Sequence, residues 1–248
     1  MLPTDLQILK YILFEKPMYY FKMKPYFRWH SYEQLTKELT SFNKRAVSSK
    51  VMHQKSLTEL EYTIFDLETT GFIPEIGHEI ISIGAIRIQG LESCSVRTFH
   101  QLVQPIRYVS RYTLKLTGLT RSQLENASPF FEVFLRFMEF SRGSVLVAHP
   151  AKFDMRFLQT MLKRWKLPAY SPFVLDSQKM AQWLMPDSRH QLDPLLRQFK
   201  IEKKERHHAL NDAIMTAELF YNLLQLTLER EVSTLGSLNK KLNQLSKE

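Results

Sequence analysis

The stretch TIFDLETTGF, residues 63–72, places two acidic side chains inside an apolar run. β-Branched and aromatic residues lead into Asp66, a leucine follows, and Glu68 comes before two threonines and a glycine. Side chains alternate across a β-strand, so residues two apart point the same way. If residues 63–68 form a strand, Asp66 and Glu68 project from one face at its C-terminal end. Carboxylates that close repel each other, and one is protonated unless a cation lies between them.

Beyond residue 60, the spacing of apolar residues predicts an α/β fold. Three segments with a period of two follow one another through short turns, which predicts antiparallel neighbours. Two short apolar runs further along predict buried strands, each followed by helical segments. Strands are expected at residues 62–68, 79–90, 95–105, 144–150 and 173–177, and helices at residues 119–143 (two), 153–167, 177–185, 192–201 and 208–230. This order predicts a mixed five-stranded sheet with helices on both faces.

The composition fits one folded domain with an appendage. The chain has 248 residues, and 44% of them are hydrophobic, which is enough for a sizeable core. The net charge of +9 and the isoelectric point near 9.5 favour a polyanionic partner such as nucleic acid. We expect a small basic, aromatic N-terminal extension over residues 1–56, a main domain over residues 57–235 and a polar tail over residues 236–248, the tail being a solvated helix or a frayed end.

The N-terminal extension interleaves aromatic and basic residues in MYYFKMKPYFRWH, residues 18–30. Such a mixture can stack bases and neutralise phosphates. The favoured interpretation is an amphipathic element that packs its aromatic rings on the main domain and leaves its charges solvated. Residues 30–42 then predict a helix with Ser31 as N-cap, and residues 43–50 a polar linker. Near residue 128, a further helix is expected to begin with Ser128 as N-cap and Pro129 in its first position.

The single cysteine, Cys94, excludes an intrachain disulfide and a thiolate metal cluster. No stretch of the sequence approaches the roughly 18 apolar residues of a membrane-spanning helix. The first residues also lack a signal-peptide pattern. We therefore expect a soluble, cytoplasmic protein without a membrane partner.

Further acidic residues lie where α/β proteins present active-site groups, at strand ends and helix N-termini. Asp154 follows one predicted buried strand and Asp176 ends another. Asp212 lies near the start of the long last helix, five residues after His207. Converging carboxylates are costly to bury unless a hard divalent cation neutralises them. Oxygen ligands favour Mg²⁺ or Mn²⁺, and two such ions about 4 Å apart are the usual catalyst of phosphodiester hydrolysis, with a histidine suited to take the proton of the attacking water.

Taken singly, each of these residues also has a structural explanation. An Asp-x-Glu pair can be an exposed strand end, and Asp154 alone can be a helix N-cap. Asp212 alone can be a charge that the helix dipole favours. The combination and its order along the chain carry the functional interpretation.

Together, FDLETTG, VAHPAKFDMRFL and HHALNDAIMTAEL resemble the three exonuclease motifs of the DEDD superfamily in its histidine-containing branch (DEDDh). That branch includes the proofreading epsilon subunit of bacterial DNA polymerase III. The resemblance covers roughly residues 60–235, so the main domain would be an exonuclease domain. It implies a ribonuclease H-like fold, two Mg²⁺ or Mn²⁺ ions, and 3′→5′ exonuclease activity.

The resemblance also implies roles for individual residues. The four carboxylates that would bind the two ions are Asp66, Glu68, Asp154 and Asp212. His207 matches the general base, and His208 stands at a secondary position where the family often has arginine. The residues matching the grip on the 3′-terminal nucleotide are Leu67, Thr69 and Thr70, to which we add Phe72 and Phe153, although core packing explains Phe153 equally well.

One departure concerns the second motif, where the family's His-Asn is replaced by His149-Pro150. Proline donates no hydrogen bond, but no metal ligand is lost. We expect His149 to be structural and Asp176 to cap a helix or to support the site from outside.

The resemblance implies hydrolysis of terminal phosphodiester bonds at a free 3′ end, releasing nucleoside 5′-monophosphates. DNA is the favoured substrate, in proofreading or repair, and a DNA polymerase is a candidate partner. Trimming of RNA 3′ ends or short oligoribonucleotides is one alternative, distinguished by acceptance of the 2′-OH. A non-catalytic nucleic-acid-binding or polymerase-associated module is another, and Pro150 is its only support.

Overall fold

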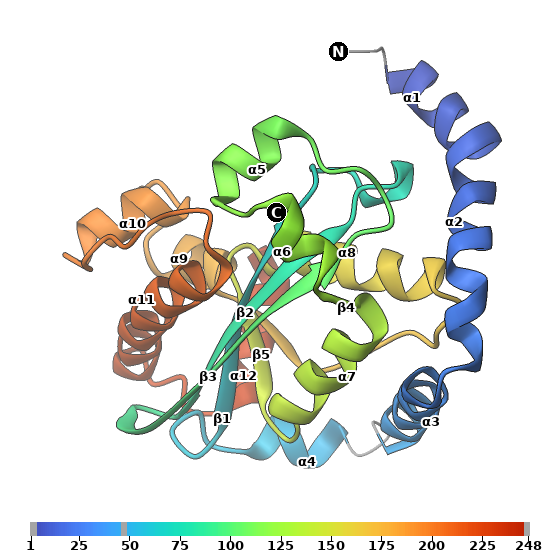
Figure 1. Cartoon of the computed structure of the whole chain (residues 1–248). Coiled ribbons are helices and arrows are strands. Elements are labelled where there is room, and N and C mark those ends of the chain that lie inside the picture. Colours follow the sequence, from blue (N-terminus) through green and yellow to red (C-terminus); the bar gives the residue numbers. More distant parts are fainter. Residues whose placement is uncertain (1–3, 46–48, 246–248) are drawn as a thin grey trace.

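The computed structural model describes residues 4–45 and 49–245, and a six-stranded mixed sheet lies at the centre of this part of the chain (Figure 1). The strands lie in the order β4-β3-β2-β1-β5-β6. They are β1 (Glu61–Thr69), β2 (Ile80–Gln89), β3 (Glu92–Gln104), β4 (Ser128–Pro129), β5 (Val145–Ala148) and β6 (Val174–Asp176). β1, β2 and β3 pair antiparallel, and β5 and β6 continue the sheet parallel to β1. The predicted α/β class and mixed sheet are confirmed.

Helices cover both faces of this sheet (Figure 1). On one face, buried side chains of three helices join the sheet in one apolar cluster: α3 (His30–Arg45), α7 (Phe130–Phe140) and α8 (Ala151–Arg164). The cluster of the other face contains residues of α9 (Ser177–Leu184), α10 (Leu192–Gln198), α11 (Ala209–Glu229) and α12 (Leu235–Leu245).

The alternation along β1 assigns its residues to these two faces. Phe65 and Leu67 belong to the cluster with α7 and α8, whereas Tyr62 and Ile64 belong to the cluster with α11. Because side chains repeat every two residues along a strand, the acids at positions 66 and 68 continue the series of Tyr62 and Ile64. The acids therefore lie on the face that α11 covers.

The sequence does not predict the strand β4 or the short helix α5 (Arg111–Thr117). β4 pairs in parallel with the end of β3, so Ser128 and Pro129 lie in the sheet. The prediction of Ser128 as a helix N-cap is wrong, because α7 begins only at Phe130 and has no side-chain cap. Two expected helices do follow one another here, since α6 (Arg121–Glu125) precedes α7.

The described part of the N-terminal extension forms consecutive helices, of which those up to α3 lie along one side of the domain and the last lies below the sheet (Figure 1). They are α1 (Thr4–Lys10), the π-helix η1 (Tyr11–Glu15), α2 (Lys16–Met23), the 3₁₀-helix η2 (Lys24–Arg28), α3 and α4 (Ser49–Gln54). Tyr19 and Met23 of α2 are buried in the same cluster as α7 and α8. Phe14 and Phe21, in contrast, are 70% and 69% exposed. The expected packing of aromatic rings on the main domain is therefore found only on the inner side of this extension, and other rings are exposed to solvent.

Two boundaries near the extension differ from prediction. α3 begins at His30, so Ser31 is a residue of the helix, and its hydroxyl donates to Glu132 Oε1 (3.2 Å) instead of capping. The expected linker at residues 43–50 is helical at both described ends, as the end of α3 and the start of α4. Residues 46–48 lie outside the described part.

The predicted polar tail begins inside α12, and this helix is packed rather than solvated. Its residues Leu235, Leu238 and Leu242 are buried in the cluster with α11. The last three residues of the tail lie outside the described part. Among the described helices, none has the length and apolar character that crossing a membrane requires.

Candidate active site

The acids of β1 lie near its C-terminal end. Asp66 is paired with Gly84 of β2, and Glu68 with Ser82. Glu68 is buried and Asp66 is partly exposed. The strand and the shared face predicted for Asp66 and Glu68 are therefore present in the structure.

Gly84 allows the start of α11 to lie against the sheet beside Asp66. A Cβ atom at position 84 would be 2.2 Å from the backbone carbon of Ala209 and 2.2 Å from the backbone nitrogen of Leu210. Backbone atoms cannot rotate away as a side chain can. The absence of a side chain at position 84 thus brings Asp212, in the first turn of α11, to the acids of β1.

We expect Gly84→Ala to displace the start of α11. Overpacking of this kind costs about 1–3 kcal/mol of the free energy of unfolding, and it moves Asp212 away from β1. Denaturant unfolding would measure the first effect and a 3′-end cleavage assay the second.

Gly143→Ala is the matched control for this variant. Gly143 has a positive φ of 81°, so alanine is strained there, but an added Cβ meets no atom within 4 Å. We expect it to lower stability without lowering cleavage beyond that effect. Equal cleavage by the two variants would contradict the role assigned to Gly84.

Glu68, His207 and Asp212 form a compact group. One potential ligand atom of each lies within 4.8 Å of those of the other two. His207 has a positive φ of 64°, and its backbone N–H donates to Asp212 Oδ2 (3.1 Å). This turn holds the histidine beside the acids although its side chain is exposed.

Asp154 joins the site from α8, which follows β5 directly. Because β5 is parallel to β1 and adjacent to it, the C-terminal ends of the two strands meet at one edge. Burial raises the pKa of the Asp154 carboxyl well above its ordinary value, and the negative charges of Asp176 and then Glu68 raise it further. A hydrogen bond from the backbone of Leu67 opposes this shift.

The pKa values of the other three carboxyls are also raised, first of all by burial. Next to burial, Asp154 and Asp212 raise the pKa of Asp66. The charge of Asp212 adds to burial in raising the pKa of Glu68 to about 8. Burial raises the pKa of Asp212 as well. A nearby cation would stabilise the ionised form of these four buried acids. Carboxylate oxygens are the donors that hard divalent cations prefer.

Arg206 is a site residue that the sequence analysis missed. Its guanidinium pairs with Asp212 and, at 3.0 Å, with Asp193. This positive charge lowers the pKa of Glu68 and Asp212. The only sequence signal is its place next to His207, since the approach to Asp212 depends on the turn at that histidine.

The residues around the second motif have structural contacts. His149 Nδ1 is 2.9 Å from Ser177 Oγ, and its Nε2 is 2.9 Å from the carbonyl oxygen of His190. Burial lowers the pKa of His149 to about 4, so the ring is neutral near neutral pH. Pro150 occupies the N-cap position of α8 without a side-chain cap.

Asp176 and His208 both cap helices. The Asp176 carboxylate accepts hydrogen bonds from the backbone N–H groups of Gln178 (3.0 Å) and Lys179 (3.2 Å) at the start of α9. His208 Nδ1 accepts from the backbone N–H of Asn211 (3.3 Å) at the start of α11. The capping role expected for Asp176 is confirmed.

The residues predicted to grip the 3′-terminal nucleotide lie around the end of β1. Leu67 is 5% exposed and belongs to the core. The Thr69 hydroxyl donates to the carbonyl oxygen of Gly71 (2.8 Å), and the Thr70 hydroxyl accepts from the backbone N–H of Glu79 (2.9 Å).

The two aromatic candidates lie beside each other. Phe72 is 75% exposed, and its ring centroid is 6.4 Å from that of the partly buried Phe153. Both threonine side chains thus shape the turn after β1, whereas Phe72 offers an open apolar surface.

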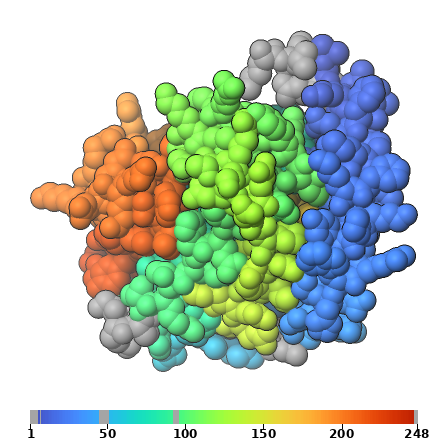
Figure 2. All heavy atoms as spheres, viewed as in Figure 1, coloured from blue at the N-terminus to red at the C-terminus, as the bar shows by residue number. Residues whose placement is uncertain are grey.

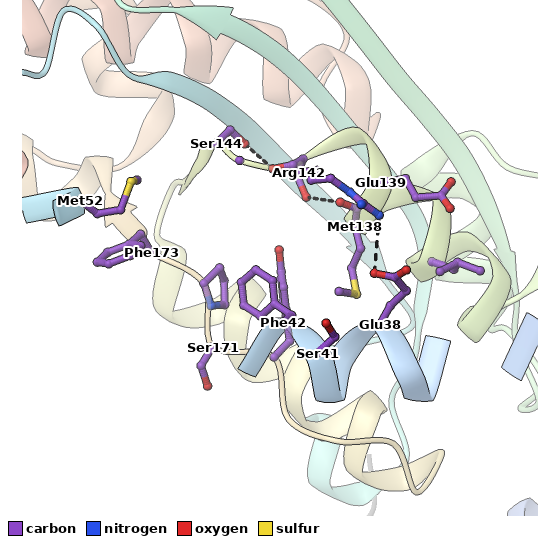
Figure 3. A pocket seen from close by; sticks show the side chains of 15 residues that line it. Glu38, Ser41, Phe42, Met52, Met138, Glu139, Arg142, Ser144, Ser171 and Phe173 are labelled. Carbon is purple, nitrogen blue, oxygen red and sulfur yellow. Dashed lines mark hydrogen bonds and ion pairs between the residues drawn. The ribbon is translucent and has the colours of Figure 1, made fainter. Parts of the chain in front are cut away.

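An apolar cavity of about 290 Å³ lies at the opposite end of the sheet (Figure 3). Its lining includes Phe42 of α3, and Ser144 and Phe173, which precede the first residues of β5 and β6. Glu38 and Arg142 form an ion pair at its edge (3.6 Å). The four acids lie at the C-terminal ends of the strands, so this cavity is separate from the candidate active site.

Comparison with known proteins gives the family. A family described as Exonuclease matches residues 63–220. The chain is 36% identical over 185 residues to a PolC-type DNA polymerase III of Caldanaerobacter subterraneus subsp. tengcongensis, and 33% identical over 184 residues to that of Thermotoga maritima. These matches cover 74% and 72% of this chain but only 13% of each relative.

A solved structure with the same fold is the nuclease domain of 3′hExo, a DEDDh family member, bound to rAMP. The TM-score is 0.59 at 24% identity, and the alignment covers 66% of this chain and 92% of that domain. The chain belongs to the Exonuclease family and is an exonuclease with a ribonuclease H-like fold, as the sequence predicts.

Proposed function

We propose that the chain removes nucleotides one at a time from the 3′ end of DNA, with Mg²⁺ or Mn²⁺ bound by Asp66, Glu68, Asp154 and Asp212. The observation that carries this proposal is the convergence of these four carboxyls, from β1, α8 and α11, on one edge of the sheet. Burial raises the pKa of each of these carboxyls, and neighbouring acids raise it further for Asp66, Glu68 and Asp154, so a bound cation would stabilise their charged forms. The relatives are named DNA polymerase III, and this supports DNA rather than RNA as the substrate of this chain.

In the proposed mechanism, the residues of the chain position the 3′ end and move one proton. The turn after β1 and the open ring of Phe72 hold the terminal nucleotide. His207, exposed beside Glu68 and Asp212, takes the proton of the water that attacks the terminal phosphate. Divalent ions at the four carboxylates would supply charge neutralisation of the phosphate and a lower pKa of the attacking water. The bond to the 3′ oxygen of the penultimate nucleotide breaks, releasing a nucleoside 5′-monophosphate.

The interaction with a DNA polymerase is also part of this proposal. In the relatives, the matched segment is part of a much longer DNA polymerase III chain, of which it makes up only 13%. If a separate chain supplies the polymerase, we expect that polymerase to co-purify with this protein. The cytoplasmic location stays a prediction from the sequence.

The proposal is tested with a time course on single-stranded and duplex DNA and RNA carrying a 5′ label. We expect a ladder that shortens from the 3′ end of DNA, appears with Mg²⁺ or Mn²⁺ and disappears with EDTA. Faster digestion of matched RNA would replace DNA by RNA as substrate. Binding of the oligonucleotides without cleavage under any of these ions would favour the non-catalytic module instead.

A further inference from the structure

A basic surface lies outside the acidic site, on residues 105–124. This stretch of twenty residues contains four cations and no acid. The cations are Arg107, Arg111, Lys115 and Arg121, and two tyrosines, Tyr108 and Tyr112, lie among them. We call the surface formed by Tyr108, Arg111, Tyr112 and Lys115 the tyrosine-basic surface.

Helix α5 carries three of the four residues of this surface, Arg111, Tyr112 and Lys115. Thr113 and Thr117 are buried, so they define the inner side of the helix. Arg111 and Lys115 are four residues apart and exposed, and Tyr112 is 74% exposed beside them. Residues four apart lie on one side of a helix. Among the described residues, no acid forms an ion pair with Arg111 or Lys115, so both charges are available to a partner.

Tyr108 completes the surface from the loop before α5. It is 70% exposed, and the guanidinium of Arg121 lies 4.4 Å from the centre of its ring. Arg121 also donates a hydrogen bond to the Tyr108 hydroxyl. These contacts hold the ring in place while most of it stays open to solvent.

The tyrosine-basic surface lies at the same end of the sheet as the four acids, where β1 and β3 have their C-terminal ends. Glu68 of β1 is paired with Ser82 of β2, which is paired with Leu102 of β3. Residues 105–110 follow β3 directly, so they leave the sheet at the edge where the acids lie. Figure 2 shows the surface of residues near 110 (green) between the N-terminal helices (blue) and the residues near 200 (orange).

The buried residue Glu79 connects this loop to the turn after β1. Its carboxylate accepts hydrogen bonds from the backbone N–H groups of Ile106 (3.2 Å) and Arg107 (2.7 Å). Its own backbone N–H donates to the Thr70 hydroxyl (2.9 Å), and its carbonyl oxygen accepts from the Thr70 backbone N–H (2.9 Å). One residue therefore joins the loop of Tyr108 to the turn proposed to hold the 3′-terminal nucleotide.

The N-terminal extension supports the same loop. The Tyr19 hydroxyl lies 3.2 Å from Glu79 Oε2 and donates to the carbonyl oxygen of Gly77 (2.7 Å). Lys22 donates to the carbonyl oxygen of Ile106 (3.1 Å). A pocket of about 270 Å³ lies between the extension and this loop. Its lining includes Lys22, Arg107 and Arg121. The extension thus adds positive charge beside the tyrosine-basic surface.

We propose that the single strand of the nucleic-acid substrate, upstream of its 3′ end, lies on the tyrosine-basic surface. Bases stack on Tyr108 and Tyr112, and phosphates contact Arg111 and Lys115. Aromatic faces with cations between them are the usual way to bind single strands without sequence preference. The inference rests on the proposed function, because it assumes a substrate whose 3′ end reaches the four acids.

The test measures binding separately from cleavage. Fluorescence anisotropy in EDTA compares a long single-stranded oligothymidylate with the wild-type chain and with the double variant Tyr108→Ala/Tyr112→Ala. We expect the Kd to rise about 10- to 100-fold, as for the loss of one or two stacked bases. The variant Tyr108→Phe/Tyr112→Phe retains the rings and should restore most of the affinity. Tyr221→Ala, on an exposed part of α11 roughly 18 Å beyond its start, is the matched control and should bind as the wild type does.

The cations are tested by the salt dependence of the same binding. Each lost phosphate contact lowers the slope of log K against log salt by about 0.7 for a single strand, so Arg111→Gln/Lys115→Gln should lower it by about 1.4. Lys163→Gln, an exposed lysine in the last turn of α8, should leave the slope unchanged. An unchanged Kd in the tyrosine variant together with an unchanged slope in the cation variant would overturn the inference.

Cleavage assays then separate this inference from the proposed function. The tyrosine variant should hydrolyse a dinucleotide as the wild type does, because so short a substrate does not reach the surface, and should show a raised KM for the long strand. A wild-type chain that binds the long strand through this surface but cleaves neither substrate would refute the proposed function alone.

Discussion

We expect Asp66→Ala and Asp212→Ala each to abolish 3′-end cleavage while the chain remains folded. Both carboxyls belong to the group that we propose to hold the ions. Asp66 stands on the central strand β1, and Asp212 comes from the opposite side of the site on α11. Removing either leaves too few oxygen ligands for ions that demand several.

The stability of these two variants provides an independent measurement. In the absence of metal, burial raises the pKa of Asp66 and of Asp212, and repulsion from neighbouring acids raises that of Asp66 further. Alanine at one position removes part of that repulsion, so the Tm in EDTA should not fall as it does for an ordinary core truncation. We expect Mn²⁺ to raise the Tm of the wild type by binding only the folded state, and we expect this rise to disappear in either variant.

Asp176→Ala is the control for both measurements. It removes the partly exposed carboxylate that caps α9, and a lost cap costs about 1 kcal/mol. We expect a lower Tm, a retained response to Mn²⁺ and retained cleavage. Full cleavage by the Asp66 or Asp212 variant would remove the proposed assignment of the site.

The local part of this site is readable in the sequence, because it depends on short-range geometry. The alternation of β1 places Asp66 and Glu68 on one face, whatever the rest of the chain does. Asp212 and His207 are close along the chain and are joined by one turn. Their meeting with the acids of β1 depends on Gly84, whose role appears only once α11 lies against the sheet.

The parts that could not be predicted depend on contacts between distant segments. β4 has two residues and exists because the end of β3 lies beside it. Arg206 reaches Asp212 through a turn with positive φ, which no residue pattern near it indicates. Glu79, isolated in the sequence, gains its importance from hydrogen bonds to a loop some 27 residues away.

Other misses did have a signal. Leu235, Leu238 and Leu242 are spaced three and four residues apart, which is the period of a helix with one apolar side. Their burial in α12 follows from that spacing, although the segment between them is polar. In the N-terminal extension, the same rule predicts one buried side, and Tyr19 and Met23, four residues apart, form it.

His207→Ala should lower the rate of cleavage by about 10²–10⁴, the usual contribution of a general base. The imidazole lies beside Glu68 and Asp212, and it is exposed, so water can reach it. Single-turnover kinetics on a labelled strand would measure the loss, and binding of the strand in EDTA should be unchanged. Added imidazole should restore part of the rate if the missing group is a base.

The neighbouring His208 provides a specific control for His207→Ala. Its side chain is the same imidazole, but it makes different contacts. Its ring accepts a hydrogen bond from the backbone N–H of Asn211 and caps α11. Asparagine is also a good N-cap, so His208→Asn should retain both stability and cleavage. A loss of rate in His208→Asn as large as that in His207→Ala would mean that the histidines act by positioning α11. A loss confined to His207, with rescue by imidazole, is the result that proton transfer requires.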